Sequence, residues 1–221
     1  MSASRSIRVV LVDDHKMMRD GLRMILEGQP EIDVVGEAAD GRSALQLVAK
    51  LEPAVVIMDV AMEGMNGIEA TRAVIESRPA TKVVVLSTHS DKRYVLNALQ
   101  AGASAYVLKD AASDDLLRAV RTVHQGLTYL SSEIAGVVVA RCLSEEGPDK
   151  SSAYGVLGKR EREVLQLIAE GRTSKEVGAQ LGITVHTVET HRRNISKKVE
   201  LHSVAELTKY AVREGLTSLE P

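Results

Sequence analysis

Residues 7–14, IRVVLVDD, form a short apolar run rich in β-branched side chains that ends directly in two aspartates. Similar short apolar runs recur at Val34–Ala38, Val55–Met58, Val83–Leu86 and Ala105–Leu108. The segments between them show the apolar spacing of helices, as at Met17, Met18, Leu22, Ile25 and Leu26. Strands that alternate with helices predict an α/β domain with a five-stranded, doubly wound parallel sheet.

The composition is that of an ordinary globular protein, with 44% hydrophobic and 26% charged residues among 221. The chain has no Phe and no Trp, so its cores must be built from aliphatic residues. The single cysteine, Cys142, excludes an intrachain disulfide and a multi-cysteine zinc site. The first residues lack the apolar core of a signal peptide and no apolar run is long enough to span a membrane, so we expect a cytoplasmic protein.

The residue pattern of the last third of the chain differs from that of the first domain and predicts helices only. Thr173 and Ser203 each precede a glutamate by three residues, which is the pattern of a capping box. A helix is predicted over Val185–Val199, after the tight turn at Gly182, and it carries a run of basic residues. Two helices joined by a glycine-containing turn, the second one basic, are typical of a helix-turn-helix. We therefore expect three parts: residues 5–126, a helix and linker over 127–156, and a small all-α domain over 157–221.

Carboxylates follow two of the predicted strands at the point where each strand ends. Asp13 and Asp14 follow the first strand and Asp59 follows the third, while Ser87 ends the fourth and Lys109 follows the fifth. The carboxyl ends of parallel strands meet at one edge of a sheet, so these groups should converge there. Converging carboxylates favour a hard cation such as Mg²⁺. A carboxylate nucleophile, a hydroxyl and an ammonium group are also what phosphoryl transfer to an aspartate needs. Each residue alone has a plainer role as a helix cap or surface side chain, but the combination favours a site.

The first domain resembles the receiver domain of two-component response regulators, which has a flavodoxin-like fold. The resemblance rests on residues 12–15 (VDDH), Met58-Asp59, residues 65–67 (MNG), residues 85–87 (VLS) and residues 106–109 (YVLK). It implies that Asp59 is the phosphoacceptor, with Mg²⁺ bound by Asp14, Asp59 and the carbonyl of Ala61, and by Asp13 through water. It also implies that Ser87 and Lys109 bind phosphoryl oxygens and that Tyr106 is a switch residue.

Glu63 departs from the receiver pattern, in which proline is usual at this position. A carboxylate close to the metal site could repel incoming phosphate or reshape the loop. It leaves open the rate and lifetime of phosphorylation.

The second domain resembles the LuxR-type helix-turn-helix, on the segments REREVL (160–165), AEG (169–171), KEV (175–177), Thr187-Val188 and His191-Arg192. Together the two halves resemble the NarL/FixJ class of response regulators. We expect base contacts from Glu189, Thr190 and Arg193, and phosphate contacts from Lys175, His191, Arg192 and Lys197. Thr187 is a further DNA-binding candidate. Gly158 stands where a capping Ser or Thr is usual, and Gly178 where alanine is usual. The resemblance also implies a dimer contact through the last helix, at Leu201, Val204, Leu207 and Ala211, although such a stripe is more often part of a core.

These expectations predict a non-enzymatic transcription regulator. Its expected partners are a sensor histidine kinase, double-stranded promoter DNA, a second copy of the chain and, in some settings, RNA polymerase, but no membrane. Two alternatives stay open: a DNA-binding regulator whose receiver works without phosphate, and a Mg²⁺-dependent aspartyl phosphatase. The phosphatase reading is disfavoured because Ala61 stands where such enzymes carry a second aspartate. No phosphate-binding loop of the G-x-x-x-x-G-K-[ST] type exists, which disfavours nucleotide kinases.

Overall fold

The computed structural model describes residues 6–110, 113–143 and 152–218. The chain divides into two compact units, Met1–Ser144 and Glu145–Pro221. The elements of the first unit are β1 (Ile7–Val12), α1 (Lys16–Glu27), β2 (Ile32–Ala38), α2 (Gly41–Leu51), β3 (Val55–Asp59), α3 (Gly67–Ser77), β4 (Lys82–Ser87), α4 (Lys92–Gln100), β5 (Ala105–Leu108), α5 (Ser113–His124), β6 (Tyr129–Leu130) and α6 (Ser132–Leu143).

The first unit is built around one parallel sheet with the strand order β2-β1-β3-β4-β5-β6. The five predicted strands and their parallel pairing are confirmed. The structure adds a sixth, β6, which pairs with β5 through Tyr129 and Leu130 only. Two residues are too few to show a strand pattern in the sequence. β6 forms because the edge of β5 offers unpaired backbone groups to Tyr129 and Leu130.

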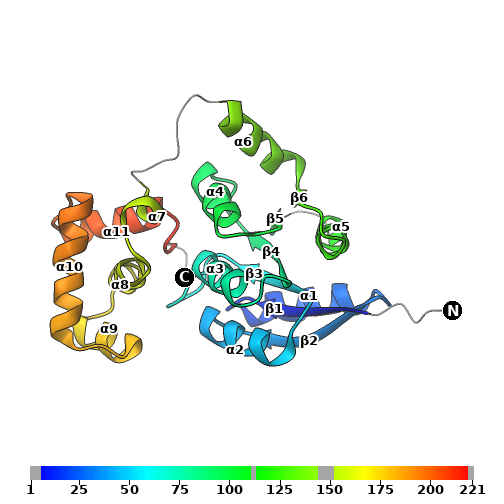
Figure 1. The fold of residues 1–221 in the computed structure, drawn as a ribbon, viewed down its shortest axis with the longest axis horizontal. Coiled ribbons are helices and arrows are strands. Elements are labelled where there is room, and N and C mark those ends of the chain that lie inside the picture. The colour runs from blue at the N-terminus through cyan, green and yellow to red at the C-terminus, as the bar shows by residue number, and fades with distance from the viewer. Residues whose placement is uncertain (1–5, 111–112, 144–151, 219–221) are drawn as a thin grey trace. The chain divides into compact units, whose positions relative to one another are not determined.

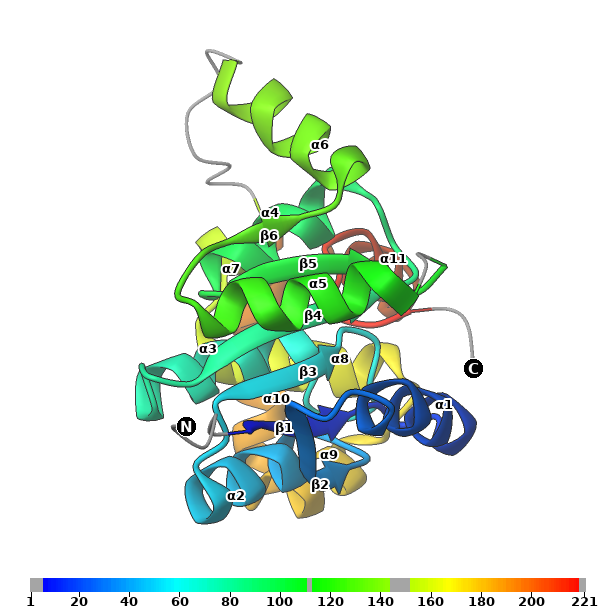
Figure 2. The same ribbon diagram turned by 90° about the vertical axis from the view of Figure 1, so that its right-hand side faces the viewer.

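Helices cover both faces of this sheet, and alternate strand residues supply the two cores. Val9, Ile57 and Val107 pack in one core cluster with residues of α1 and α5, such as Leu26 and Val120. Figure 2 shows α1 and α5 in front of the strands on this face. The opposite face is covered by α2, α3 and α4, and α6 lies beside α4 (Figure 1). A sheet that is buried on both faces explains why its strands read as continuous apolar runs.

The second unit is all-helical. It contains α7 (Ala153–Val156), α8 (Lys159–Ala169), α9 (Ser174–Leu181), α10 (Val185–Val199) and α11 (Val204–Arg213). The two predicted capping boxes are confirmed at the starts of α9 and α11. The predicted glycine turn is also confirmed, because Gly182 ends α9 in the left-handed region with φ 66°. Among the described residues, no helix combines the length and apolar character needed to cross a bilayer.

Candidate functional site

The strand order brings the predicted polar residues to one edge of the sheet. Asp59 and Ser87 are the last residues of β3 and β4, and Lys109 directly follows β5. Since β3 lies between β1 and β4, Asp13 and Asp59 leave neighbouring strands at the same end. The residues that are far apart in the chain therefore form one pocket, which we call the acidic pocket: Asp13, Asp14, His15, Asp59 and Lys109.

Lys109 reaches across this pocket to two buried carboxylates. Its Nζ lies 2.7 Å from Oδ2 of Asp13 and 3.0 Å from Oδ2 of Asp59. The side chains of Asp13 and Asp59 are 1% and 2% exposed, and that of Lys109 is 11% exposed. Because the contacts are shielded from water, the ammonium group compensates the two carboxylates far better than a surface lysine would.

Burial dominates the protonation of Asp59. It raises the pKa of this carboxyl to about 6, and the nearby charge of Asp13 adds to the rise, while Lys109 opposes it. Three carboxylates and one lysine meet in the acidic pocket, so the ionised site would carry net negative charge, which is the environment that attracts a cation.

Four groups of the acidic pocket could hold such a cation together. One ligand atom from each of Asp13, Asp14, His15 and Asp59 can be chosen so that all lie within 4.8 Å of one another. Among the described residues, Oδ1 of Asp14 and Oδ2 of Asp59 are buried without a hydrogen-bond donor, although Asp59 keeps its ion pair with Lys109. Oxygen atoms that are buried and short of donors fit a hard divalent cation.

The loop after β3 packs tightly around Asp59. The amide of Ala61 lies 3.4 Å from Oδ1 of Asp59. A Cβ on Gly67 would stand 1.8 Å from the carbonyl oxygen of Asp59, so only glycine allows α3 to begin there. Asn66 caps that helix by accepting a hydrogen bond from the amide of Glu69 at 2.9 Å. Glu63 is exposed on the same loop.

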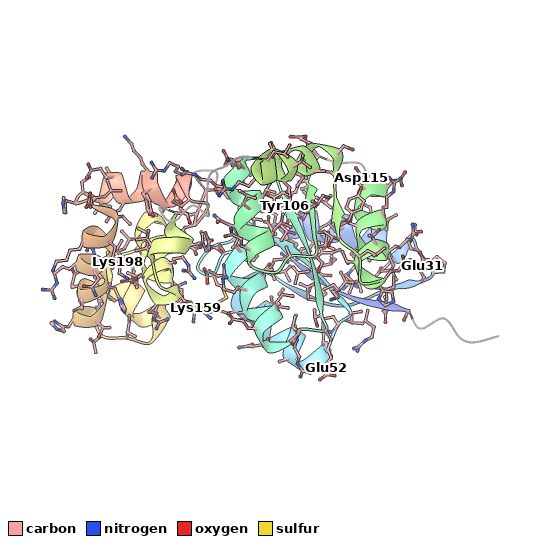
Figure 3. The ribbon with its side chains drawn as sticks, turned by 45° about the horizontal axis from the view of Figure 1, so that its top comes forward. Glu31, Glu52, Tyr106, Asp115, Lys159 and Lys198 are labelled. Atoms are coloured by element: carbon pink, nitrogen blue, oxygen red, sulfur yellow. The ribbon has the colours of Figure 1, made fainter. Side chains whose placement is uncertain are left out.

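Ser87 and Tyr106 meet at the loop after β4. The amide of His89 donates to Oγ of Ser87 at 3.0 Å, and the hydroxyl of Tyr106 donates to the carbonyl of His89 at 2.6 Å. Tyr106 is fully buried in the first unit, and Figure 3 labels it there. Its burial raises the pKa of the phenol well above its ordinary value. The two predicted residues are thus linked through one backbone residue, His89, whose ring also stacks on Tyr94 at 4.4 Å.

In the second unit, α9 and α10 form the helix-turn-helix. Thr184 caps α10 by accepting from the amide of Thr187 at 3.1 Å. Val188 and Ile195 lie on the same face of α10 and are fully buried in the core of this unit. The opposite face of α10 is left for contacts outside the unit. Among the predicted DNA-contacting residues, Lys175, Arg193 and Lys197 are exposed, whereas Thr187, Glu189, Thr190, His191 and Arg192 are half-buried.

Glu189 is held from two sides. Ser174 Oγ, at the start of α9, donates to Oε1 of Glu189, and an Arg192 nitrogen lies 3.3 Å from the same oxygen. The hydrogen bond from Ser174 is the main reason that the pKa of Glu189 is lowered. Arg193 has a looser contact, 3.4 Å from Oγ1 of Thr190. Helix α10 therefore carries one carboxylate held in place, that of Glu189, and one guanidinium with a looser contact, that of Arg193.

The two unusual glycines of this unit have different roles. Gly158 caps α8 without a side chain, and its amide donates to Glu161 at 2.8 Å instead, which is half of a capping box. Gly178 is required for close packing, because a Cβ there would lie 2.8 Å from the carbonyl oxygen of Ile183. The alanine that is usual at this position would force the turn to shift.

The apolar stripe of α11 is largely intramolecular. Leu207 and Ala211 are 2% and 0% exposed and lie in the core, with Leu201 packed against it. In this conformation these side chains are not available to a second copy of the chain, because α11 uses them to close the unit against α8. Val204, which is 50% exposed, is the residue of the four that faces outward.

Two residues of these sites had no role in the sequence analysis. His15 directly follows the paired aspartates, and that adjacency was the available signal. Ser174 lies fifteen residues before Glu189 and is one of many serines, so only the packing of α9 against α10 reveals its role.

Comparison with known proteins agrees with this architecture. Residues 9–121 match the family model of the response regulator receiver domain, and residues 155–211 match that of the bacterial regulatory proteins of the luxR family. The chain is 42% identical over 212 residues to the transcriptional regulatory protein LiaR of Bacillus subtilis strain 168, covering 96% of this chain and all of LiaR. It is 39% identical over 214 residues to the oxygen regulatory protein NreC of Staphylococcus carnosus strain TM300, covering 95% of this chain and 99% of that one.

Among solved structures, the chain is similar to the response regulator ChrA of a heme-sensing two-component system, with 33% identity and a TM-score of 0.52. That similarity covers 96% of this chain and 98% of ChrA. Both domains, their order and nearly the full length are therefore shared with these relatives. The chain belongs to the two-component response regulators that join a receiver domain to a LuxR-type DNA-binding domain.

Proposed function

We propose that Asp59 accepts a phosphoryl group from a sensor histidine kinase and that this modification controls binding of α10 to promoter DNA. The observation that carries the proposal is the placement of Lys109 between Asp13 and Asp59 at the carboxyl edge of the sheet. In the transfer, an oxygen of Asp59 forms a bond to phosphorus as the bond from phosphorus to the kinase histidine nitrogen breaks.

The residues of the acidic pocket fit Mg²⁺. Asp14, Asp59 and the carbonyl of Ala61 would hold the ion directly, with Asp13 acting through water. When bound, Mg²⁺ would neutralise negative charge on the phosphoryl group. Lys109 and Ser87 would bind phosphoryl oxygens from the other sides. Ser87 and Tyr106 both contact His89, and the ring of His89 stacks on Tyr94 of α4. Through these contacts, phosphorylation of Asp59 would change the surface near α4.

DNA binding is assigned to residues 157–221 and phosphate acceptance to residues 5–126, with residues 127–156 between them. We place Arg193, Glu189 and Thr190 at base edges, because Arg suits guanine and Glu accepts from cytosine. Lys175, His191, Arg192 and Lys197 would contact the phosphate backbone, and Thr187, at the start of α10, is a further DNA-binding candidate. A protein that takes phosphate from a kinase and reads promoter DNA would act in the cytoplasm.

We also propose that the DNA-bound form is a homodimer. Val204, exposed at the start of α11, is the apolar residue of that helix best placed to contact a second copy. Substitution V204D should weaken self-association on DNA while leaving the core of the unit intact.

The phosphorylation proposal is tested by incubating the full chain with Mg²⁺ and acetyl phosphate, followed by intact-mass analysis. One phosphate should add to the wild type and none to D59A, while D114A, which changes an exposed aspartate in the first turn of α5, should behave as wild type. Equal labelling of wild type and D59A would refute Asp59 as the acceptor.

The DNA-binding proposal is tested by mapping binding across the genome for wild type and R193A. We expect R193A to lose discrimination among sites, with about 1–3 kcal/mol less specific binding free energy. Unchanged affinity and selectivity would remove Arg193 from the set of base contacts.

A further inference from the structure

His15 stands between β1 and α1 with one face of its imidazole against the acidic pocket. Its Nδ1 lies 2.8 Å from Oδ1 of Asp14 and 3.4 Å from Oδ1 of Asp13. The side chain as a whole is 60% exposed. One ring nitrogen therefore reaches the carboxylates while most of the ring faces solvent.

The local backbone sets this position. The amide of His15 donates to Oδ1 of Asp13 at 2.8 Å, and the carbonyl of His15 accepts from the amide of Arg19 in the first turn of α1. His15 is the N-cap residue of α1, yet its side chain makes no capping hydrogen bond. The backbone is fixed at both ends and the imidazole is not needed by the helix, so it is available to the pocket.

The approach of His15 to Asp14 does not have the geometry of a hydrogen bond. Oδ1 of Asp14 is buried and has no hydrogen-bond donor among the described residues, although Nδ1 of His15 is close to it. Two adjacent ligands, each about 2.1 Å from one octahedral ion, stand about 3 Å apart. The observed 2.8 Å between Nδ1 and Oδ1 matches the spacing of two neighbouring ligands of a single ion.

His15 also belongs to a group of four potential metal ligands. A ring nitrogen of His15 and one oxygen each from Asp13, Asp14 and Asp59 lie within 4.8 Å of one another, and Nδ1 is the nitrogen that lies close to Asp13 and Asp14. Three carboxylates alone make a hard site of the kind that suits Mg²⁺. An imidazole beside them adds a nitrogen ligand, which Mn²⁺, as a first-row transition metal, accepts more readily than Mg²⁺ does.

We propose that Nδ1 of His15 is an additional metal ligand of the acidic pocket and that it makes the pocket favour Mn²⁺ over Mg²⁺. The inference rests on the proposed function, because it concerns the same cation site. Nδ1 of His15 would supply a lone pair to the ion, so that His15 and Asp14 would both bind the cation. The identity of the bound ion would then depend on the supply of manganese as well as on magnesium.

The competing explanation is a simple charge contact in which His15 serves only as a counterion for Asp14. In that case the imidazole would not touch the metal and would have no effect on the choice between the two cations. Spectroscopy on the bound ion separates the two roles, because only direct ligation couples nitrogen to the metal's electrons.

The test uses the full chain without a histidine tag, loaded with Mn²⁺. Electron spin-echo envelope modulation should show coupling to one ¹⁴N nucleus in the wild type, and the coupling should change to that of ¹⁵N after labelling of histidine. The variant H15A should lose the signal. A control variant, H124A, changes an exposed histidine at the C-terminal end of α5 and should keep the nitrogen signal.

Equilibrium binding supplies the second measurement. The ratio of Mn²⁺ affinity to Mg²⁺ affinity, measured by competition, should fall by about ten-fold or more in H15A and stay unchanged in H124A. A bound Mn²⁺ without nitrogen coupling, or an unchanged affinity ratio in H15A, would overturn the role of His15.

The two proposals can fail separately. If the wild type accepts phosphate from acetyl phosphate with Mg²⁺ but its Mn²⁺ shows no nitrogen coupling, the inference about His15 falls and the proposed function stands. If the wild type neither binds Mn²⁺ nor accepts phosphate, both fall.

Discussion

Lys109 and Asp59 form a buried ion pair, with 3.0 Å between Nζ and Oδ2, although fifty residues of chain separate them. The same ammonium group lies 2.7 Å from Asp13, so one cation serves two carboxylates that are both nearly inaccessible to water. Removing it leaves two like charges facing each other in a medium that screens them poorly.

We therefore expect K109A to lower the free energy of unfolding of the first unit by about 3–5 kcal/mol at pH 7.5 in EDTA. Added Mg²⁺ should recover part of the loss by supplying a cation to the same carboxylates. Urea denaturation followed by circular dichroism measures both. The control is K50A, which changes an exposed lysine at the end of α2; equal stability of the two variants would contradict the role of Lys109.

Neutralising Asp59 should stabilise the metal-free protein in a way that depends on pH. Burial and Asp13 raise the pKa of Asp59 to about 6 in the folded state, above its unfolded value. The folded state therefore binds the extra proton, so the ionised carboxylate costs stability above about pH 6. That cost shrinks as the pH falls from about 6 to 4 and is absent below the unfolded pKa.

D59N should accordingly be more stable than wild type by about 1–3 kcal/mol at pH 7.5 in EDTA, with the difference vanishing near pH 4. Urea denaturation of both proteins across this range gives the difference directly, and groups shared by the two proteins cancel. A difference that does not change with pH would show that Asp59 does not titrate in the expected interval.

Ser174 should act on DNA recognition only through Glu189. Its hydroxyl donates to Oε1 of Glu189 and so restricts the carboxylate before DNA arrives. We expect S174A to reduce discrimination at the base pair that Glu189 reads while changing thermal stability little, since both side chains lie near the surface. A double-mutant cycle with E189A checks this, because the effect of S174A should disappear once Glu189 is absent.

Lys175 and Lys197 are exposed and should contribute through phosphate contacts. Removing either should weaken binding to specific and unrelated DNA alike and lower the salt dependence of affinity by about one ion. Fluorescence anisotropy at several salt concentrations measures the slope. K209A, on the exposed part of α11, is the matched control; a loss confined to one DNA sequence would assign the lysine to base readout instead.

Gly178 and Gly136 should respond to alanine with opposite signs. Both are helical, but a Cβ on Gly178 would meet the carbonyl oxygen of Ile183 at 2.8 Å, whereas a Cβ on Gly136 has nothing within 4 Å. G178A should therefore destabilise the second unit by about 1–3 kcal/mol. G136A should stabilise α6 by roughly 0.5–1 kcal/mol, the usual gain of alanine over glycine in a helix. Thermal unfolding of the full chain tests both, and stabilisation by G178A would show that the turn can shift freely.

Much of the fold was predictable because it follows from local sequence patterns. The run from Ile7 to Val12 predicts a buried strand by its β-branched side chains, and Thr173 with Glu176 predicts the start of α9 by capping chemistry. The acidic pocket was predictable for a related reason: once the strands are parallel neighbours, residues at their carboxyl ends must meet. The resemblance to receiver domains then attached roles to Asp59, Lys109 and Tyr106 that no local pattern contains.

The remaining features depend on what each residue meets across space. The apolar spacing of Leu207 and Ala211 suits an interface and a core equally well, and only the packing of α11 shows that they are buried. β6 exists because β5 offers it an open edge. The sequence alone determined the five longer strands, the capping boxes of α9 and α11 and the strand ends at which the carboxylates lie, since these follow from nearest-neighbour chemistry and periodicity. The tertiary structure decided that Lys109 lies between Asp13 and Asp59, that His15 approaches Asp14, and that Gly178 admits the turn, because these distances depend on the side-chain and backbone conformations that packing selects within each unit.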